Sequence, residues 1–512
     1  MLAFAVVISS VHLEADVVAD GGDFVDVAFE VPAGTRELRV SHTDGDPDVI
    51  LDFGVWSPEG FRGWGGGNTE DAIIGVEQSS RSYLPGAITP GMGWTVVIGK
   101  AQLSNGVGHY SIDITFDDAA TLTPRPQAPF APVVLGTERR WYKGDLHVHS
   151  DESGDASATF DEINALATQR GLDFVNLSDH NTSSQLALIA AAQPGYGVLM
   201  LRGAEITTYA GHGNAVGLPS YIDHRIGYQG RTITNVLDEV EAQGALFIVD
   251  HPSLDLGDVC IGCAWRHETT PWNKVAGIEV ITGKWDLVES LFVPKAIELW
   301  DEQLSAGHRI AAIGGSDDHS AGEGTGLTDT PLGSPTTLVL ADALSEAGIL
   351  EGIRKGRTMV MLRGPDDPLI DVHLETADGL AEIGDEVSNL ASAKFPLTIT
   401  TGAGGVVQLW RDGVLVDDIE VDADSFRHTF VDAPGAAPRR YRIEMINDGG
   451  KRIVVTSHFY VNGIAVEDGC GCRSNEPTGA VLVVLAIGGL VVLRRRRYSL
   501  STMRTASSSL SG

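Results

Sequence analysis

Cysteine is scarce in this chain, with only four residues among 512. They fall in two close pairs, Cys260 with Cys263 and Cys470 with Cys472. So few cysteines exclude a fold held together by many disulfide bonds. The first pair has no second Cys-x-x-Cys motif to complete a four-cysteine zinc site, so we expect a local disulfide or two free thiols there.

Basic residues are also few, since 36 Lys and Arg stand against 69 Asp and Glu and give a formal net charge of −33. Such a surface repels phosphate backbones, which excludes a protein that binds DNA or RNA as a polymer. A small anionic substrate is still compatible with this charge if bound metal ions supply positive charge locally.

The N-terminus lacks the positive residues that normally precede the apolar core of a signal peptide. Its sequence, LAFAVVISSVHLEA, is nevertheless apolar for most of its length. Residues 1–15 therefore predict either a weak export segment or a first β-strand.

An uncharged apolar run lies near the C-terminus, AVLVVLAIGGLVVL at 480–493, and four arginines at 494–497 follow it. With its flanks the run predicts a transmembrane helix whose arginines stay in the cytoplasm. We therefore expect an exported protein anchored in the cell envelope or at the cell surface. The cysteine pair, apolar run and arginine cluster within 468–512 resemble the sorting tails of myxobacterial surface proteins. That resemblance implies a processing protease that acts near Cys470 and Cys472.

The rest of the chain divides into four parts by composition and periodicity. Short alternating runs such as FVDVAFEV predict an antiparallel β-sandwich over 16–120. A proline-rich linker follows at 121–140. Strand-like and helix-like segments then alternate over 141–362, which predicts an α/β domain, most simply a barrel. Residues 366–463 return to β patterns and predict a second β-sandwich.

Residues with metal-binding side chains stand at the ends of the predicted strands of the middle domain. Any one of them alone is more often an ordinary polar residue, whereas the whole set is hard to attribute to chance. In α/β barrels the loops at the carboxyl ends of the strands bring such residues into one site. The set is His147, His149, Asp179, His180, Glu205, His212, Asp250, His251, Glu279, Asp317, Asp318 and His319.

Nitrogen and oxygen ligands without cysteine suit zinc, manganese or iron, and this number of ligands suits two or three ions. Clustered divalent ions activate a bridging water as hydroxide and clamp a phosphoryl or carbonyl oxygen, so the pattern predicts a metal-dependent hydrolase. No G-x-S-x-G elbow or Walker loop is present to indicate a serine hydrolase or a nucleotide-binding site.

The motifs DLHVHS, SDH, GAE, GHGN, DHP and GSDDH resemble, in this order, those of the polymerase-and-histidinol-phosphatase (PHP) domain. Their spacing is similar in particular to the CehA/McbA branch of that family. The resemblance spans 141–362 and implies a distorted (β/α)7 barrel with a metal cluster. It assigns ligand positions to His147, His149, His180, Glu205, His212, His251, Asp317 and His319, with Glu205 as a bridge.

The first loop departs from the family pattern, because HSDESGDA stands where HS-x-x-SDG is usual. Asp155 is one place late, and Asp151 is the alternative acidic ligand. We choose Asp155, because the serine and glycine before it can relax the turn. Glu279 and Asp179 are expected to orient ligating imidazoles.

Catalytic roles are expected for His212, Glu205 and Asp155, with His212 either a metal ligand or a proton donor to the leaving group. Arg202, Arg266 and Lys284 are candidates for binding an anionic substrate, although each is as readily a plain surface charge.

Three functions follow from this reading. The first is a phosphoesterase that acts on small phosphate esters through a metal-bridging hydroxide. The second keeps the same metal cluster but hydrolyses a carboxylic ester, a carbamate or an amide. The third is a non-catalytic surface adhesion protein with an inert barrel, which is disfavoured because the ligand set is nearly complete.

Overall fold

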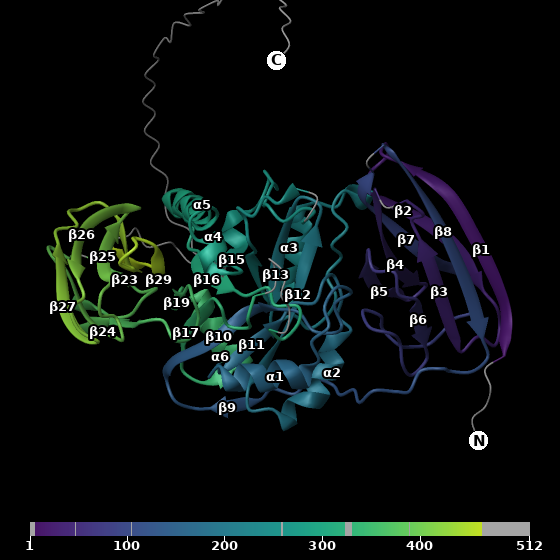
Figure 1. The fold of residues 1–512 in the computed structure, drawn as a ribbon, viewed down its shortest axis with the longest axis horizontal. Helices are drawn as coiled ribbons and strands as arrows, with labels where there is room; N and C mark the ends of the chain where they lie inside the picture. Colours follow the sequence, from purple (N-terminus) through teal and green to yellow (C-terminus); the bar gives the residue numbers. More distant parts are fainter. Residues whose placement is uncertain are drawn as a thin grey trace, which may run out of the picture. The chain divides into compact units, whose positions relative to one another are not determined.

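The computed structural model describes residues 6–46, 48–103, 105–257, 260–322, 330–388 and 390–462 (Figure 1). Within these residues the fold is mixed α/β with strands in the majority, which confirms the predicted α/β class. An N-terminal β-sandwich, a central α/β region and a C-terminal β region follow one another along the chain.

Alternating buried and exposed side chains build the N-terminal β-sandwich. In β2, Val27, Phe29 and Val31 are buried while the residues between them are exposed, as expected for a strand with one face in the core. Two antiparallel sheets, in the orders β1-β8-β3-β6 and β2-β7-β4-β5, enclose a core that includes Trp94. The strands are β1 (Val7–Val18), β2 (Phe24–Val31), β3 (Glu37–Thr43), β4 (Val49–Ser57), β5 (Gly60–Gly66), β6 (Ala72–Gly75), β7 (Gly91–Leu103) and β8 (Val107–Asp117).

The start of this domain lies earlier than residue 16. Residues 7–15, for which the sequence left open an export segment or a strand, belong to β1 and pair with β8.

Seven neighbouring strands, β10 to β16, form the central region. Six of them run in the same direction, whereas β13 pairs antiparallel with both β12 and β14 and so runs in the opposite direction. A parallel bridge between Val148 and Asp318 connects the first strand to the segment after the last, so the sheet curves toward a barrel. The strands are β10 (Arg140–Val148), β11 (Phe174–Leu177), β12 (Leu199–Thr208), β13 (Gly211–Val216), β14 (Leu246–Val249), β15 (Val275–Thr282) and β16 (Ala311–Gly315).

The hairpin between β12 and β13 differs from the regular strand–helix alternation that the sequence predicted. Only Tyr209 and Ala210 separate these two strands, so there is no room for a helix between them.

Capped helices cover this sheet. Thr159 caps α1 and exchanges hydrogen bonds with Glu162, and Thr232 caps α3 with Asn235 in the same way, which satisfies the first free N–H groups of each helix. Two helices, α4 and α5, follow one another before β16, and Pro294 stands in the first turn of α5, where no N–H is needed. The helices are α1 (Phe160–Gln169), α2 (Gln185–Ala192), η1 (Gln193–Gly195), η2 (Tyr228–Gly230), α3 (Ile233–Ala242), η4 (Trp272–Lys274), α4 (Trp285–Val288), α5 (Val293–Ser305) and α6 (Glu346–Arg354).

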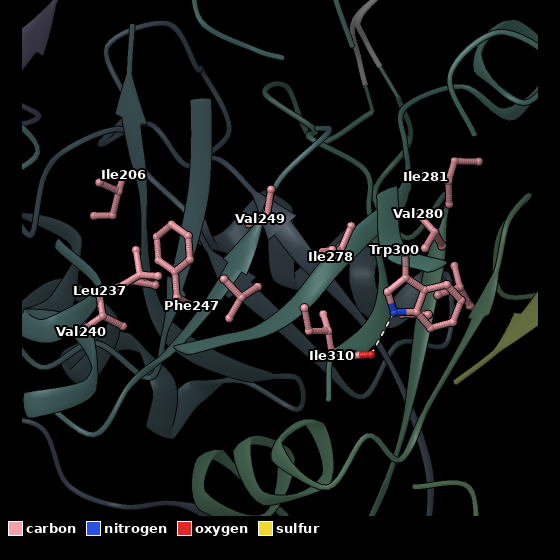
Figure 2. Packing of buried hydrophobic residues seen from close by; sticks show 14 of the residues in the cluster. Ile206, Leu237, Val240, Phe247, Val249, Ile278, Val280, Ile281, Trp300 and Ile310 are labelled. Atoms are coloured by element: carbon pink, nitrogen blue, oxygen red, sulfur yellow. Dashed lines mark hydrogen bonds between the residues drawn. The ribbon is translucent and has the colours of Figure 1, made fainter. Parts of the chain in front are cut away.

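The core between these helices and the sheet keeps the strand ends in place. Figure 2 shows Phe247 and Ile278 of the strands in the same buried cluster as Trp300 of α5. The indole N–H of Trp300 donates to the carbonyl oxygen of Ile310 at 2.9 Å, so the polar atom of this buried ring is satisfied (Figure 2).

The C-terminal β region is continuous with the central sheet. From β10 the sheet continues through β17 and β19 to β29, β28, β25 and β26, while β20, β24 and β27 form a second sheet. Its core includes Phe395 and Tyr441. The remaining strands are β9 (Val134–Gly136), β17 (Thr336–Ala341), β18 (Leu344–Ser345), β19 (Thr358–Met361), β20 (Leu369–Val372), β21 (Leu374–Thr376), β22 (Gly379–Ala381), β23 (Glu386–Val387), β24 (Ala393–Thr400), β25 (Val406–Arg411), β26 (Val414–Glu420), β27 (Ser425–Asp432), β28 (Arg439–Ile446), β29 (Arg452–Thr456) and β30 (Phe459–Val461).

The predicted C-terminal segment 468–512, with Cys470, Cys472, the transmembrane helix and the arginine cluster, lies outside the described residues. Among the residues that are described, none of the helices has the length and apolar character needed to cross a membrane.

Candidate metal centre

The predicted metal-binding residues gather at one rim of the seven-stranded sheet. His149, His180, His251 and His319 follow the carboxyl ends of β10, β11, β14 and β16, which run in parallel. His212 instead stands near the start of β13, and because β13 runs in the opposite direction, its first residues lie at this same rim.

The Glu205 carboxylate of β12 lies at the centre of this cluster and is 1% exposed. Neither of its oxygens has a hydrogen-bond partner in the described structure, and the same is true of Nε2 of His147 and His149. Buried polar atoms without a hydrogen-bond partner destabilise the folded state, and a cation bound between these atoms would interact favourably with all of them. Five imidazoles surround the carboxylate. Its Oε1 lies 3.0 Å from His212 Nδ1 and 3.5 Å from His251 Nε2. Its Oε2 lies 2.9 Å from His180 Nδ1, 3.5 Å from His147 Nε2 and 3.6 Å from His149 Nε2.

Asp317 provides a second carboxylate to the same imidazoles. Its Oδ1 lies 3.3 Å from His147 Nε2 and 3.1 Å from His149 Nε2. Its backbone φ of 59° is left-handed, a conformation that aspartate adopts more readily than most non-glycine residues.

Three overlapping sets of these residues have ligand atoms within 4.8 Å of one another. The sets are His149 with His180 and His319, His147 with His149 and Asp317, and His147 with Glu205 and His251. His149 belongs to the first and second of these sets and His147 to the second and third, so neighbouring sets share ligand residues.

Backbone carbonyls fix which nitrogen of several imidazoles is available as a ligand. Nδ1 of His251 contacts the carbonyl oxygen of Cys263 at 3.1 Å, Nδ1 of His319 contacts that of Asp317 at 2.8 Å, and Nε2 of His212 contacts that of Ile261 at 3.1 Å. A carbonyl only accepts, so in each case the contacting nitrogen carries the proton and donates. The other nitrogen of each neutral ring then turns its lone pair toward the cluster, as metal ligation requires.

The Glu279 carboxylate does the same for His147. Its Oε1 accepts from His147 Nδ1 at 3.0 Å, and its Oε2 accepts from the backbone N–H of His251 at 2.8 Å. Glu279 therefore orients one ligating ring and holds the segment that carries another, as its predicted role requires.

Asp179 has a different role from the one predicted. It contacts no imidazole but accepts from the backbone N–H of Ser150 at 2.7 Å and from its hydroxyl at 2.8 Å. Asp179 therefore fixes the loop that follows His149 instead of orienting a ring.

The first loop brings Asp155, and not Asp151, to the cluster. Oδ2 of Asp155 lies 3.3 Å from His180 Nε2 and 3.5 Å from His319 Nε2. Asp155 also lines the cavity at the cluster, whereas Asp151 is not among its lining residues. Glu152, the residue after Asp151, is fully buried and faces the N-terminal sandwich.

Burial and the surrounding charges shift the pKa values of His147 and His149 in different directions. Burial opposes protonation of His147, but Glu279 and Asp317 outweigh it and raise its pKa well above the ordinary value. Burial together with the neighbouring His319 and His180 lowers the pKa of His149 to about 3. His149 is therefore neutral at physiological pH, the state in which imidazole binds metals.

Buried Asp250 also belongs to this rim, although the sequence gave it no role. Burial and the neighbouring Glu279 raise its pKa well above the ordinary value, and neither of its oxygens has a hydrogen-bond partner in the described structure. His147, Asp250 and Glu279 form a further set of close ligand atoms.

The three basic residues predicted to bind substrate do not line the cavity at the cluster. Arg202 is held by Glu346 through contacts of 2.6 and 3.2 Å and lies over the ring of Phe130, so its charge is already neutralised. Arg266 is largely exposed and pairs with Asp255 at 3.0 Å beside a smaller neighbouring pocket. Lys284 is the residue that directly precedes α4.

The cluster forms the floor of a cavity of about 770 Å³. The side chains of Trp64 and Asp52, from the N-terminal sandwich, also line it. Sequence reasoning missed these residues because neither lies in a metal-binding motif, and no local pattern indicates which face of a sandwich meets another domain.

The Cys260–Cys263 pair forms a disulfide, one of the two states expected, so the sulfur of Cys263 is not a thiolate ligand. The carbonyl oxygen of Cys263 still contributes by holding His251.

Comparisons with known proteins give limited similarity. No protein-family model and no curated protein matches the chain. A Bacteroides vulgatus two-domain protein containing a predicted PHP-like metal-dependent phosphoesterase is 20% identical, with 66% of this chain and all of that chain covered and a TM-score of 0.36. An amidohydrolase from Chromobacterium violaceum is 16% identical over 36% of this chain and 93% of its own, with a TM-score of 0.24. A candidate metal-dependent phosphoesterase from Bifidobacterium adolescentis is 14% identical over 37% of this chain and 91% of its own, with a TM-score of 0.25.

Proposed function

We propose that the chain is a metal-dependent hydrolase of the phosphoesterase type that acts on small phosphate esters. The observation that carries this proposal is the buried Glu205 carboxylate with five imidazole nitrogens around it and no hydrogen bond to either oxygen. When bound, two or three divalent ions would lower the pKa of a coordinated water and polarise the phosphoryl oxygens of the substrate.

The residues of the rim divide this work among themselves. Glu205 belongs to the set with His147 and His251, and its other oxygen faces His180, so its carboxylate could hold more than one ion. Asp155 closes the outer set with His180 and His319. His212 lines the cavity beside Glu205 at 3.0 Å, so it is placed either to ligate or to pass a proton to the leaving group.

The second candidate, hydrolysis of a carboxylic ester, carbamate or amide by the same cluster, is favoured by one feature of the cavity. Among the described residues, no lysine or arginine lines it, so a bound anion would depend on the metal ions alone for positive charge. A carbonyl substrate would need less positive charge than a phosphate dianion.

Turnover of 4-nitrophenyl phosphate and 4-nitrophenyl acetate separates these candidates. We expect the wild-type chain to hydrolyse the phosphate, to lose this activity on chelation, and to regain it with zinc, manganese or iron. Glu205→Gln should remain inactive after metal is added, whereas the exposed control Glu298→Gln should keep full activity. Turnover of the acetate alone would favour the second candidate, and phosphate turnover that survives both chelation and Glu205→Gln would contradict the proposed site.

We also propose that the protein is exported and held at the cell envelope by the apolar run at 480–493, with processing near Cys470 and Cys472. The support is the sequence of this segment, with its arginine cluster at 494–497. Membrane fractionation of the full chain and of a chain ending at residue 467 tests it. Release of only the shorter chain into the soluble fraction is expected, and equal distribution of both would contradict it.

A further inference from the structure

The cavity above the metal centre is shared between two domains. Its inner side is formed by the metal-binding rim, including Glu205, His212 and Asp317. Its outer side is formed by the N-terminal sandwich, through residues that include Asp23, Phe24, Asp52 and Trp64.

Polar contacts hold the sandwich against the loop that carries Asp155. Nη1 of Arg81 donates to the carbonyl oxygen of Ala156 at 2.8 Å, and the Ser82 hydroxyl donates to that of Glu152 at 2.7 Å. The Glu152 carboxylate in turn pairs with Arg125 of the linker at 2.5 Å. The outer wall is therefore fixed relative to the metal-binding loop.

The close approach at Gly154 agrees with this docking. A Cβ atom there would lie 2.6 Å from the carbonyl oxygen of Gly65, closer than real Cβ contacts allow. Gly154 directly precedes Asp155, so the sandwich contacts the loop at the residue beside the predicted ligand.

Two aromatic rings of the sandwich, Trp64 and Phe24, line the cavity beside Tyr209 and His224 of the central region. Trp64 of β5 meets His224 edge to face, with ring centroids 4.5 Å apart, and Phe24 of β2 stacks on Tyr209 at 5.8 Å and 18°. These four residues line the cavity together with aliphatic side chains. Flat apolar groups bind well on such surfaces.

The charges on this wall are acidic. Asp52 accepts from the Tyr209 hydroxyl at 2.7 Å, and burial raises its pKa to about 6, so it is ionised above neutral pH. Asp23 lies at the exposed margin of the same wall. With no lysine or arginine along the described lining, an anionic group here would meet carboxylates without a compensating cation.

We propose that the N-terminal β-sandwich forms the outer half of the substrate site and selects esters whose group away from the scissile bond is flat and uncharged, excluding those with a second negative charge. This inference rests on the proposed metal-dependent hydrolase. It assigns Trp64 and Phe24 to binding the flat group and Asp52 to rejecting anions.

Phenyl phosphate and 4-carboxyphenyl phosphate form a matched pair for the test, because they differ only in a charge at the distal end. We expect kcat/KM of the wild type at pH 8 to be at least about tenfold higher for phenyl phosphate, since one repulsive contact of this kind supplies roughly that factor. Asp52→Asn, which keeps an acceptor for Tyr209, should narrow this ratio to about threefold or less. Equal kcat/KM values for the two substrates in the wild type would overturn the proposal.

Trp64→Leu separates binding of the flat group from catalysis. Its KM for phenyl phosphate should rise at least about fivefold while kcat and the KM for methyl phosphate stay within about twofold, because only the aromatic substrate reaches the wall. Phe24→Ala should act in the same direction and serves if Trp64→Leu does not fold. Met92→Ala, on the same sandwich but 66% exposed and outside the cavity lining, should leave all these constants unchanged. A parallel loss with methyl phosphate in both cavity variants would overturn the proposal.

A binding experiment without metal distinguishes failure of this inference from failure of the proposed function. Indole and indole-5-carboxylate are compared by saturation-transfer NMR on the metal-free full chain. Contact with indole that Trp64→Leu weakens, and no contact with the carboxylate, supports the wall even if no phosphate ester is hydrolysed. Equal signals from both probes, or signals that Trp64→Leu leaves unchanged, would overturn it even if the metal centre is active.

Discussion

Glu279→Gln should weaken metal binding while leaving the fold intact. The Glu279 carboxylate uses one oxygen for Nδ1 of His147 at 3.0 Å and the other for the backbone N–H of His251 at 2.8 Å. A glutamine has one oxygen that accepts and one amide nitrogen that only donates. One of these two donors therefore loses its acceptor, and either the ring of His147 or the segment of His251 is no longer held.

The expected magnitude follows from the position of Glu279 behind a ligand. Loss of such an outer partner typically weakens metal affinity about 10- to 100-fold, which corresponds to roughly 1.4–2.7 kcal/mol. Competition with a metal-binding dye, carried out with zinc and with manganese, measures this change directly.

Glu37→Gln provides the matched control for this prediction. Glu37 is also fully buried and accepts from the backbone N–H and the hydroxyl of Thr121, but it belongs to the N-terminal sandwich. We expect this variant to lose stability without a change in metal affinity. Wild-type affinity in Glu279→Gln, or an equal loss of affinity in both variants, would refute the reasoning.

Three further predictions concern stability. Burial lowers the pKa of His42, which is stacked on Phe53, to about 4, so the unfolded chain takes up the proton first as the pH drops from about 6.5 toward 4. The free energy of unfolding in urea should therefore fall by up to about 2 kcal/mol between pH 7 and pH 5. His42→Gln should remove this part of the pH dependence. Trp300→Ala should lower the free energy of unfolding by about 3–5 kcal/mol in the same assay, because it empties a fully buried site and leaves the carbonyl of Ile310 without its donor (Figure 2). A loss below about 1 kcal/mol would contradict this packing. Glu444→Ala should lower the free energy of unfolding by about 3 kcal/mol, because it leaves the buried Arg442 guanidinium with Asp301 as its remaining acidic partner. An unchanged free energy of unfolding would show that the pair of Arg442 and Glu444 does not stabilise the fold.

The metal-binding rim could be predicted because its signals are local. Each ligand stands beside a buried apolar run, as His180 does after Phe174–Leu177, and parallel strands bring such ends to one edge. The reversal of β13 was not visible in this way. His212 reaches the rim only because its strand runs backwards, which depends on pairing with β12 and β14.

Features that depend on contacts between distant segments could not be predicted. Asp155 rather than Asp151 approaches the cluster from a loop whose Glu152 is held by Ser82 and Arg125, both distant in sequence. The sequence around Arg202 is compatible with a substrate ligand, but in the structure its charge is neutralised by Glu346, which is far away in sequence. Sequence periodicity reports which face of an element is buried but not what covers it.

Metal content is the measurement that tests the central claim most directly. The full chain is purified in mild detergent without chelator and analysed for elements beside a His147→Ala, His149→Ala double variant. Two to three zinc, manganese or iron ions per chain in the wild type, and their loss in the variant, are predicted. Folded wild-type protein that holds no metal, even after incubation with each of these ions, would contradict the account.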